Sequence, residues 1–242
     1  KLKFSKLEQI YLANEAKLKG TVRVPGDKSI SQRALIIGLI SIGITKIENI
    51  LESEDVRHTL NAIKLLGGII NIERNQIEIK GCGIGNMVSP KEPIYMGNSG
   101  TGTRLLIGLV AGSRAVVTFY GDNSLSERPM DRIIKPLEKM GAKFLCAREE
   151  KLPITVVGAR RKGLTLPIEY KLPMASAQVK SALILAALTA RGTSKILEMN
   201  RTRNNTEEML ANCGVDIKTK ANKNKCFLTE LKGISHIKAS NI

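Results

Sequence analysis

The chain has 242 residues, of which 43% are hydrophobic and 25% charged, and its formal net charge is +16. A chain of this length can bury roughly 70–75% of its unfolded surface, and it fits one large domain or two small ones. The composition is that of an ordinary soluble globular protein, and no apolar stretch approaches the roughly 20 residues needed to span a bilayer.

The strong positive charge allows two interpretations, nucleic-acid binding or a basic cleft for small polyanions. The basic residues are spread along the chain and only 3% of residues are aromatic, so stacking platforms for single strands are lacking and the second interpretation is favoured. The four cysteines show no C-x-x-C pairing, and the N-terminal residues lack the apolar core of a secretory signal. The sequence therefore predicts a cytoplasmic protein with reduced thiols, no metal site, no membrane partner and no nucleic-acid partner.

One plan occurs three times along the chain. An apolar run leads to a Ser-bearing turn that opens an amphipathic helix, at residues 25–29, 97–101 and 174–178. Each time a second helix follows and ends at Gly67, Gly141 or Gly214, and these glycines lie roughly 73 residues apart. The repeat predicts three copies of one supersecondary unit, with three helix starts whose free N–H groups could hold anions.

The first unit is predicted as βαβαββ. Ser53 is expected to cap its second helix, and Gly67 to end that helix. Its elements are expected at 21–24 (strand), 29–40 (helix), 45–50 (strand), 53–66 (helix), 69–73 (strand) and 76–80 (strand).

The other two units repeat this plan. The second is expected at 94–96 (strand), 99–111 (helix), 115–120 (strand), 129–140 (helix), 142–147 (strand) and 154–157 (strand). The third is expected at 164–170 (strand), 176–190 (helix), 194–199 (strand), 206–212 (helix), 215–219 (strand) and 226–231 (strand). Because apolar helix faces must be buried together, the predicted fold class is α/β (α+β), one lobe with buried helices and outer sheets.

Five segments carry a family resemblance. They are GTVRVPGDKSISQR at 20–33, GNSGTGTR at 97–104, SERPM at 126–130, MASAQVKSA at 174–182 and TRNNTE at 202–207. In this order they resemble the motifs of the 5-enolpyruvylshikimate-3-phosphate (EPSP) synthases. The related UDP-N-acetylglucosamine enolpyruvyl transferases share the repeat plan but lack the Pro-Gly-Asp-Lys-Ser turn, and they stay an alternative.

The resemblance implies an enzyme of two lobes, each of three such units, closing on shikimate 3-phosphate and phosphoenolpyruvate. The enolpyruvyl group passes to the 5-hydroxyl of shikimate 3-phosphate and phosphate leaves, with no metal or organic cofactor. The domain prediction has three parts: residues 1–19 lead from a missing lobe, 20–231 form the lobe (units at about 20–82, 92–158 and 163–231), and 232–242 cross back.

The resemblance also assigns site residues. The shikimate 3-phosphate side takes Lys28, Ser29, Arg33, Ser176, Gln178 and Arg203. The phosphoenolpyruvate side takes Lys28, Asn98, Gly100, Arg128 and Gln178. Lys28 contacts both substrates and is the catalytic candidate, since paired cations and helix starts suit polyanions. Arg104 is a further candidate for ligand binding, and its alternative is a structural role. For Ser29 the alternative to ligand binding is helix capping.

Three positions depart from the family pattern. Gln32 stands where the family commonly has His, and Asn204 and Asn205 stand where it commonly has Asp and His. The largest departure is the absence of a second half, which carries the family's carboxylate base and further Lys and Arg ligands. The sequence therefore predicts a lobe that is inactive alone, with the missing half as a partner.

Two further functional alternatives stay open, a non-catalytic module that binds shikimate 3-phosphate, and a basic nucleic-acid binder. Gly100 adds a pharmacological expectation. A complete enzyme with glycine at this position is expected to be sensitive to glyphosate, which occupies the phosphoenolpyruvate position in the family.

Overall fold

The computed structural model describes residues 19–73, 76–221, 226–234 and 236–242. The first unit contains α1 (Lys28–Ile40), β1 (Ser41–Ile42), β2 (Ile44–Glu48), α2 (Glu54–Leu65), β3 (Ile69–Glu73) and β4 (Gln76–Lys80). The second contains β5 (Ile94–Tyr95), α3 (Gly100–Ala111), β6 (Val116–Tyr120), α4 (Asn123–Ser126), α5 (Asp131–Lys139), β7 (Lys143–Arg148) and β8 (Lys151–Val157). The third contains β9 (Glu169–Lys171), α6 (Ala177–Ala187), β10 (Thr193–Glu198), α7 (Asn205–Asn212), β11 (Ile217–Ala221) and β12 (Phe227–Lys232), before β13 (Ile237–Lys238).

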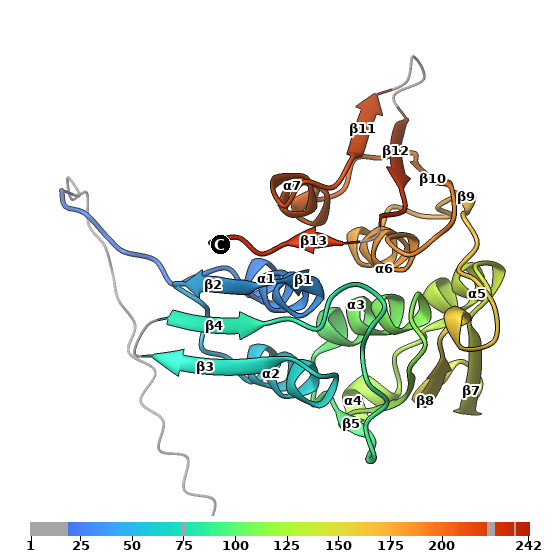
Figure 1. The fold of residues 1–242 in the computed structure, drawn as a ribbon, viewed down its shortest axis with the longest axis horizontal. Coiled ribbons are helices and arrows are strands. Elements are labelled where there is room, and N and C mark those ends of the chain that lie inside the picture. Colours follow the sequence, from blue (N-terminus) through green and yellow to red (C-terminus); the bar gives the residue numbers. More distant parts are fainter. Residues whose placement is uncertain (1–18, 74–75, 222–225, 235) are drawn as a thin grey trace, which may run out of the picture.

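Three sheets surround a centre of helices (Figure 1). Their strand orders are β2-β4-β3, β5-β6-β8-β7 and β11-β12-β10-β9. Helices α1, α3 and α6 lie between the sheets, and nearly all of their residues are buried. This confirms the predicted class, an α/β lobe with buried helices and outer sheets. Of the helices in the described ranges, none is both long and apolar enough to cross a membrane.

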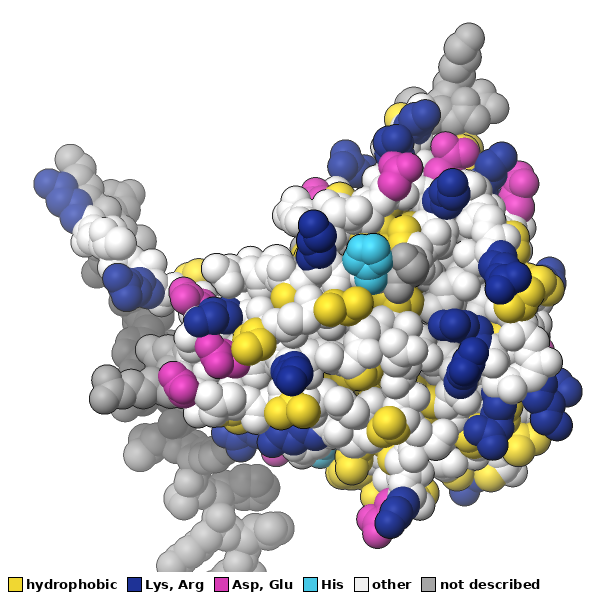
Figure 2. Space-filling view, in the orientation of Figure 1, with side chains coloured by type: hydrophobic (Ala, Val, Ile, Leu, Met, Phe, Trp, Pro, Cys, Tyr) yellow, Lys and Arg dark blue, Asp and Glu magenta, His cyan; other side chains and the backbone are white. Residues whose placement is uncertain are grey.

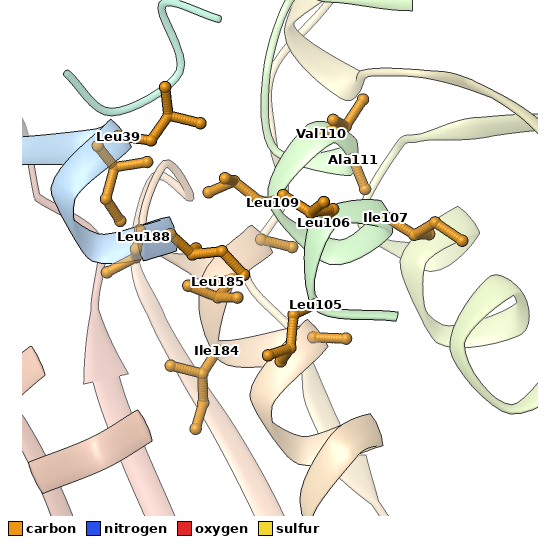
Figure 3. Close-up of a cluster of buried hydrophobic side chains, with 14 of the residues drawn as sticks. Leu39, Leu105, Leu106, Ile107, Leu109, Val110, Ala111, Ile184, Leu185 and Leu188 are labelled. Carbon is orange, nitrogen blue, oxygen red and sulfur yellow. The ribbon is translucent and has the colours of Figure 1, made fainter. Parts of the chain in front are cut away.

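The α3–α6 contact is the centre of the core, where leucine and isoleucine side chains from α1, α3 and α6 meet (Figure 3). A Cβ added at Gly108 on α3 would lie 2.3 Å from the Ala182 carbonyl oxygen on α6. One turn later, a Cβ at Gly112 would lie 2.7 Å from the Ala186 carbonyl oxygen. The two glycines therefore let the helix backbones approach closely, which fixes how the starts of α3 and α6 lie relative to each other.

The predicted strand at 21–24 is wrong. Its residues have no strand structure, and Val22 and Val24 are 84% and 74% exposed. In the other two units the first strand pairs in parallel with the third element, β5 with β6 and β9 with β10.

The corresponding edge of β2 is occupied by the last residues of the chain. Lys46 pairs in parallel with Asn241, and β1 pairs in parallel with β13. Backbone bonds run from Glu48 N–H to the Ile242 carbonyl (3.0 Å) and from Ile242 N–H to the Lys46 carbonyl (2.8 Å). The segment 237–242 thus takes the place at the first sheet that 21–24 was predicted to take.

The other differences are local. The predicted strand at 164–170 is reduced to β9, because Pro167 has no N–H and the Leu166 N–H bonds to the Met140 carbonyl. The short helix α4 was not predicted. Asp122 caps it, with its carboxylate accepting from the Leu125 N–H at 2.7 Å. The domain boundaries at 19/20 and 231/232 stay a prediction, and residues 1–18 lie outside the described ranges.

Candidate functional site

The first helix start places Lys28 at the first position of α1. Asp27 caps this helix by accepting from the Ile30 N–H at 2.8 Å, so the capping alternative considered for Ser29 is wrong and Ser29 lies in the first turn. Lys28 Nζ lies 2.8 Å from Asp55 Oδ2, and half of its side chain is exposed. The ammonium group is therefore oriented by a carboxylate and still open to solvent, as an anion-binding lysine requires.

Arg33 lies one turn further along α1 and is only 5% exposed. Its Nε donates to Thr206 Oγ1 (2.7 Å), its Nη2 to Ser181 Oγ (3.2 Å) and its Nη1 to the Ser29 carbonyl (3.0 Å). Burial lowers the pKa of Arg33, opposed by Glu207 and Asp27 and reinforced by the positive charge of Arg203. Arg33 therefore joins the starts of α1, α6 and α7, and Arg203 adds a second positive charge beside it.

The second helix start gathers arginines around Gly100. A Cβ added there would lie 2.8 Å from Arg128 Nη1 and 3.1 Å from Arg104 Nη1. Arg128 donates through Nη2 to Asn98 Oδ1, and Asn98 Nδ2 donates to Asp122 Oδ2 at 2.9 Å. Burial lowers the pKa of Arg104, with further lowering by Arg128 and Arg132 against the opposing charge of Asp131. The positive charges of Arg104, Arg128 and Arg132 outnumber the nearby carboxylates of Asp122 and Asp131. This net positive charge lies at the positive end of the α3 dipole, where an anion is favoured.

Gln178 joins the third helix start to the second. Its Oε1 accepts from Arg104 Nη1 at 3.0 Å, and its Nε2 donates to Thr101 Oγ1 at 3.0 Å. Ser176 caps α6, with its hydroxyl accepting from the Val179 N–H. Hydrogen bonds therefore join the second helix start to the third through Arg104 and Gln178, and the first to the third through Arg33 and Ser181, with Arg203 near Arg33. Within the described residues, no side-chain contact joins Lys28 or Ser176 to another predicted site residue. The Arg104 contacts to Gln178 and to the Gly100 carbonyl support both of its alternatives, ligand binding and a structural role.

A buried charge cluster behind this site was not predicted. Lys180 Nζ lies 2.9 Å from Glu198 Oε1 and 2.7 Å from Glu207 Oε1, and the three side chains are 0–7% exposed. Glu198 also accepts from the Thr202 hydroxyl at 2.7 Å. The cluster fixes the loop between β10 and α7, which carries Arg203. Nothing in the sequence indicates that these three residues pair, although Lys180 and Glu207 lie inside the motifs at 174–182 and 202–207.

Asn204 and Asn205, two of the positions that depart from the family pattern, lie at the start of α7. Asn204 precedes α7 without a side-chain capping bond, and its Nδ2 donates to Glu208 Oε1. Within the described residues, His, Cys, Asp and Glu side chains form no group of three or more that could hold a metal ion.

The model of the family "EPSP synthase (3-phosphoshikimate 1-carboxyvinyltransferase)" matches residues 12–238. The chain belongs to the EPSP synthase family. It is 50% identical over 211 residues to the 3-phosphoshikimate 1-carboxyvinyltransferase of Streptococcus agalactiae serotype Ia, covering 86% of this chain and 49% of that protein. It is 44% identical over 228 residues to the same enzyme of Parvibaculum lavamentivorans, covering 93% and 49%.

A solved EPSP synthase from Acinetobacter baumannii is similar with a TM-score of 0.85 and 40% identity, covering 92% of this chain and 49% of that structure. The chain thus spans about half the length of the relatives it matches. Family membership confirms the predicted resemblance and the transferase class.

Proposed function

We propose that this chain forms one lobe of an enolpyruvyl transferase that moves the enolpyruvyl group of phosphoenolpyruvate to the 5-hydroxyl of shikimate 3-phosphate. The observation that carries the proposal is the gathering of cations at the helix starts, with Lys28 at the start of α1, Arg104 and Arg128 around Gly100, and Arg33 bonded to the third unit. Both substrates carry several negative charges, and a wall of cations and helix starts fits them. The matched relatives are named for shikimate 3-phosphate, which favours this acceptor over a UDP-sugar.

In the proposed arrangement, Arg33, Arg203, Ser29 and Ser176 hold the phosphate side of shikimate 3-phosphate. Arg33 uses three of its five N–H groups on protein oxygens, so its fork is fixed before the ligand arrives. Arg128, Asn98 and the Gly100 backbone hold phosphoenolpyruvate, and Gln178 lies between the two ligands. Lys28 lies at the junction and balances the charge that both ligands bring together.

In the same proposal, the general acid–base groups and further cationic ligands come from the missing second half, and no metal or organic cofactor takes part. This chain alone then binds substrate without turnover, because proton transfer requires those groups within hydrogen-bond reach. Cytoplasmic location and glyphosate sensitivity of the complete enzyme belong to this proposal too.

Calorimetric titration of the purified chain with shikimate 3-phosphate, beside a phosphate-release assay with both substrates, tests it. We expect measurable binding, no turnover, and turnover once the second half is supplied as a separate chain. Turnover at rates usual for enzymes by this chain alone would refute the lobe interpretation. Binding without turnover even when the second half is present would favour the non-catalytic module.

The nucleic-acid alternative has its own mark, a steep fall in affinity for random DNA with rising salt. On the face seen in Figure 2, Lys and Arg side chains are distributed among other residues over several elements, which gives no support for a single basic stripe.

A further inference from the structure

Ser99 is a serine at a helix start that does not cap its helix. Ser53 before α2 and Ser176 before α6 both accept a backbone N–H through the side chain. Ser99 stands in the same position before α3 and makes no such bond. The first backbone bond at this start runs from the Thr103 N–H to the Ser99 carbonyl at 3.0 Å. Among the residues that the structure describes, the N–H groups of Thr101 and Gly102 have no hydrogen-bond acceptor, and they lie at the end of α3 near the arginines.

The Ser99 hydroxyl is held by Gln32. Gln32 Nε2 lies 2.7 Å from Ser99 Oγ, 3.0 Å from Thr59 Oγ1 and 3.3 Å from the Asp55 carbonyl oxygen, and the side chain is fully buried. The Asp55 carbonyl can only accept, so it fixes which end of the amide points toward this group of oxygens. Gln32 Oε1 has no hydrogen-bond partner among the described residues, so the amide nitrogen alone makes the hydrogen bonds of this side chain.

The Ser99 hydroxyl lies close to Gly102, the residue whose N–H a capping serine at this position would accept from. A Cβ added at Gly102 would lie 2.7 Å from Ser99 Oγ, 2.7 Å from Thr59 Oγ1 and 2.8 Å from Gln32 Nε2. Gly102 is the third residue of α3, and a capping serine accepts from the N–H of the second or third residue. The absence of a side chain at Gly102 makes room for the amide–hydroxyl group, in which the Ser99 hydroxyl accepts from Gln32 and makes no capping bond.

We propose that Gln32 is a positioning residue that keeps the first-turn N–H groups of α3 open for an anionic group of the substrate. The identification of the ligand as the carboxylate or phosphate of phosphoenolpyruvate rests on the proposed function. The absence of a side-chain cap at the start of α3 does not. An anion seated there receives the Thr101 and Gly102 N–H groups from one side and the guanidinium groups of Arg104 and Arg128 from the other. Gln32 touches no substrate and acts only through Ser99.

The test compares Gln32→Met, Ser99→Ala and the double variant with the parent chain. Without ligand, hydrogen exchange of the Thr101 and Gly102 amides is followed by NMR. We expect fast exchange in the parent chain and at least ~5-fold slower exchange of one of these amides in Gln32→Met, the ratio that a typical serine cap provides. In the double variant the hydroxyl is gone, and fast exchange should return.

With ligand, phosphoenolpyruvate is titrated into the same four chains in the presence of shikimate 3-phosphate. Gln32→Met is expected to bind phosphoenolpyruvate about 5-fold more weakly, and the double variant to recover most of that loss. A merely structural role for Gln32 predicts the opposite pattern, in which Ser99→Ala adds to the loss. Thermal unfolding of each variant confirms that it is folded, and Gln32→His gives a second variant at the position if Gln32→Met does not fold.

Unchanged exchange at both amides in every folded Gln32 variant would overturn the inference. If the parent chain binds no phosphoenolpyruvate while the exchange pattern appears as expected, the proposed function of this half fails and the uncapping of α3 stands.

Discussion

Arg33 and Thr206 are 173 positions apart in the chain, and Arg33 Nε donates to Thr206 Oγ1 at 2.7 Å. Thr206 Oγ1 also lies 2.7 Å from Ser181 Oγ, which accepts from Arg33 Nη2. One guanidinium group therefore sets the relative positions of the first and third units, and it does so inside the proposed substrate wall.

Arg33→Lys should separate charge from geometry. Lysine keeps the positive charge but cannot reach both hydroxyls, so Thr206 and Ser181 lose a donor in a buried place. We expect a loss of about 1–3 kcal/mol in the free energy of unfolding and weaker binding of shikimate 3-phosphate. Urea unfolding and calorimetry measure the two effects. Arg161→Lys, at an exposed position, is the matched control and should change neither quantity.

Gly100→Ala should weaken phosphoenolpyruvate binding without unfolding the chain. The added Cβ would lie 2.8 Å from Arg128 Nη1 and 3.1 Å from Arg104 Nη1, both at the far ends of flexible side chains that can move away. Because the displaced guanidinium groups are those proposed to hold the ligand, affinity should fall about 10-fold, which corresponds to ~1.4 kcal/mol.

Gly163→Ala is the control for this change, since a Cβ there would come no closer than 3.7 Å to the Ala159 carbonyl oxygen. Equal affinities of the Gly100→Ala and parent chains for phosphoenolpyruvate would place the ligand away from Gly100.

Lys180→Met should be among the most destabilising single changes in the third unit. The substitution leaves Glu198 and Glu207 buried without their cation, a situation that typically costs about 3–5 kcal/mol. Lys218→Met removes the partner of Asp216 in an exposed pair and should have little effect. Denaturant midpoints of both variants provide the comparison. A Lys180→Met chain as stable as the Lys218→Met chain would show that the buried cluster carries no net stabilisation.

Asp122 should contribute to acid sensitivity near the Arg128 site. The Leu125 N–H and then the Asn98 amide lower the pKa of the Asp122 carboxyl in the folded chain. A lowered folded-state pKa stabilises the fold above the unfolded value, about 3.9, and that contribution is lost as pH falls through the folded value. Asp122→Asn removes this titration, so the stability difference between the parent and Asp122→Asn chains should shrink as pH is lowered from 5 to below the folded pKa. A difference that stays constant over this range in thermal unfolding would contradict the assignment.

Removal of residues 237–242 should open the first sheet. The deletion removes the backbone bonds to Lys46 and Glu48 and the buried side chain of Ile237. An unpaired strand edge is a template for pairing with another chain, so we expect lower stability and concentration-dependent self-association. Sedimentation velocity of the shortened and parent chains tests this, and a purely monomeric shortened chain would count against it.

The sequence predicts elements well where the pattern is local. The predicted strands at 69–73 and 76–80 coincide with β3 and β4, because alternating apolar residues and flanking turns suffice to define a hairpin. Residues 21–24 alternate equally well but form no strand, because a strand also requires a free partner edge, and that edge of β2 is occupied by the distant segment 237–242.

The site follows the same division. The motifs identify Lys28, Arg128 and Gln178 as single positions, and the starts of α2 and α6 follow from their capping serines. The contacts that orient these side chains, such as Arg104 with Gln178 and Gln32 with Ser99, join residues 74 and 67 positions apart and leave no signal in one sequence.

The pairing of β2 with the final residues has a consequence for biosynthesis. During translation the first unit leaves the ribosome long before the segment that completes its sheet is made. The nascent lobe must therefore hold an unpaired edge of its first sheet until residues 237–242 emerge, so that this sheet is completed only after the third unit has been made.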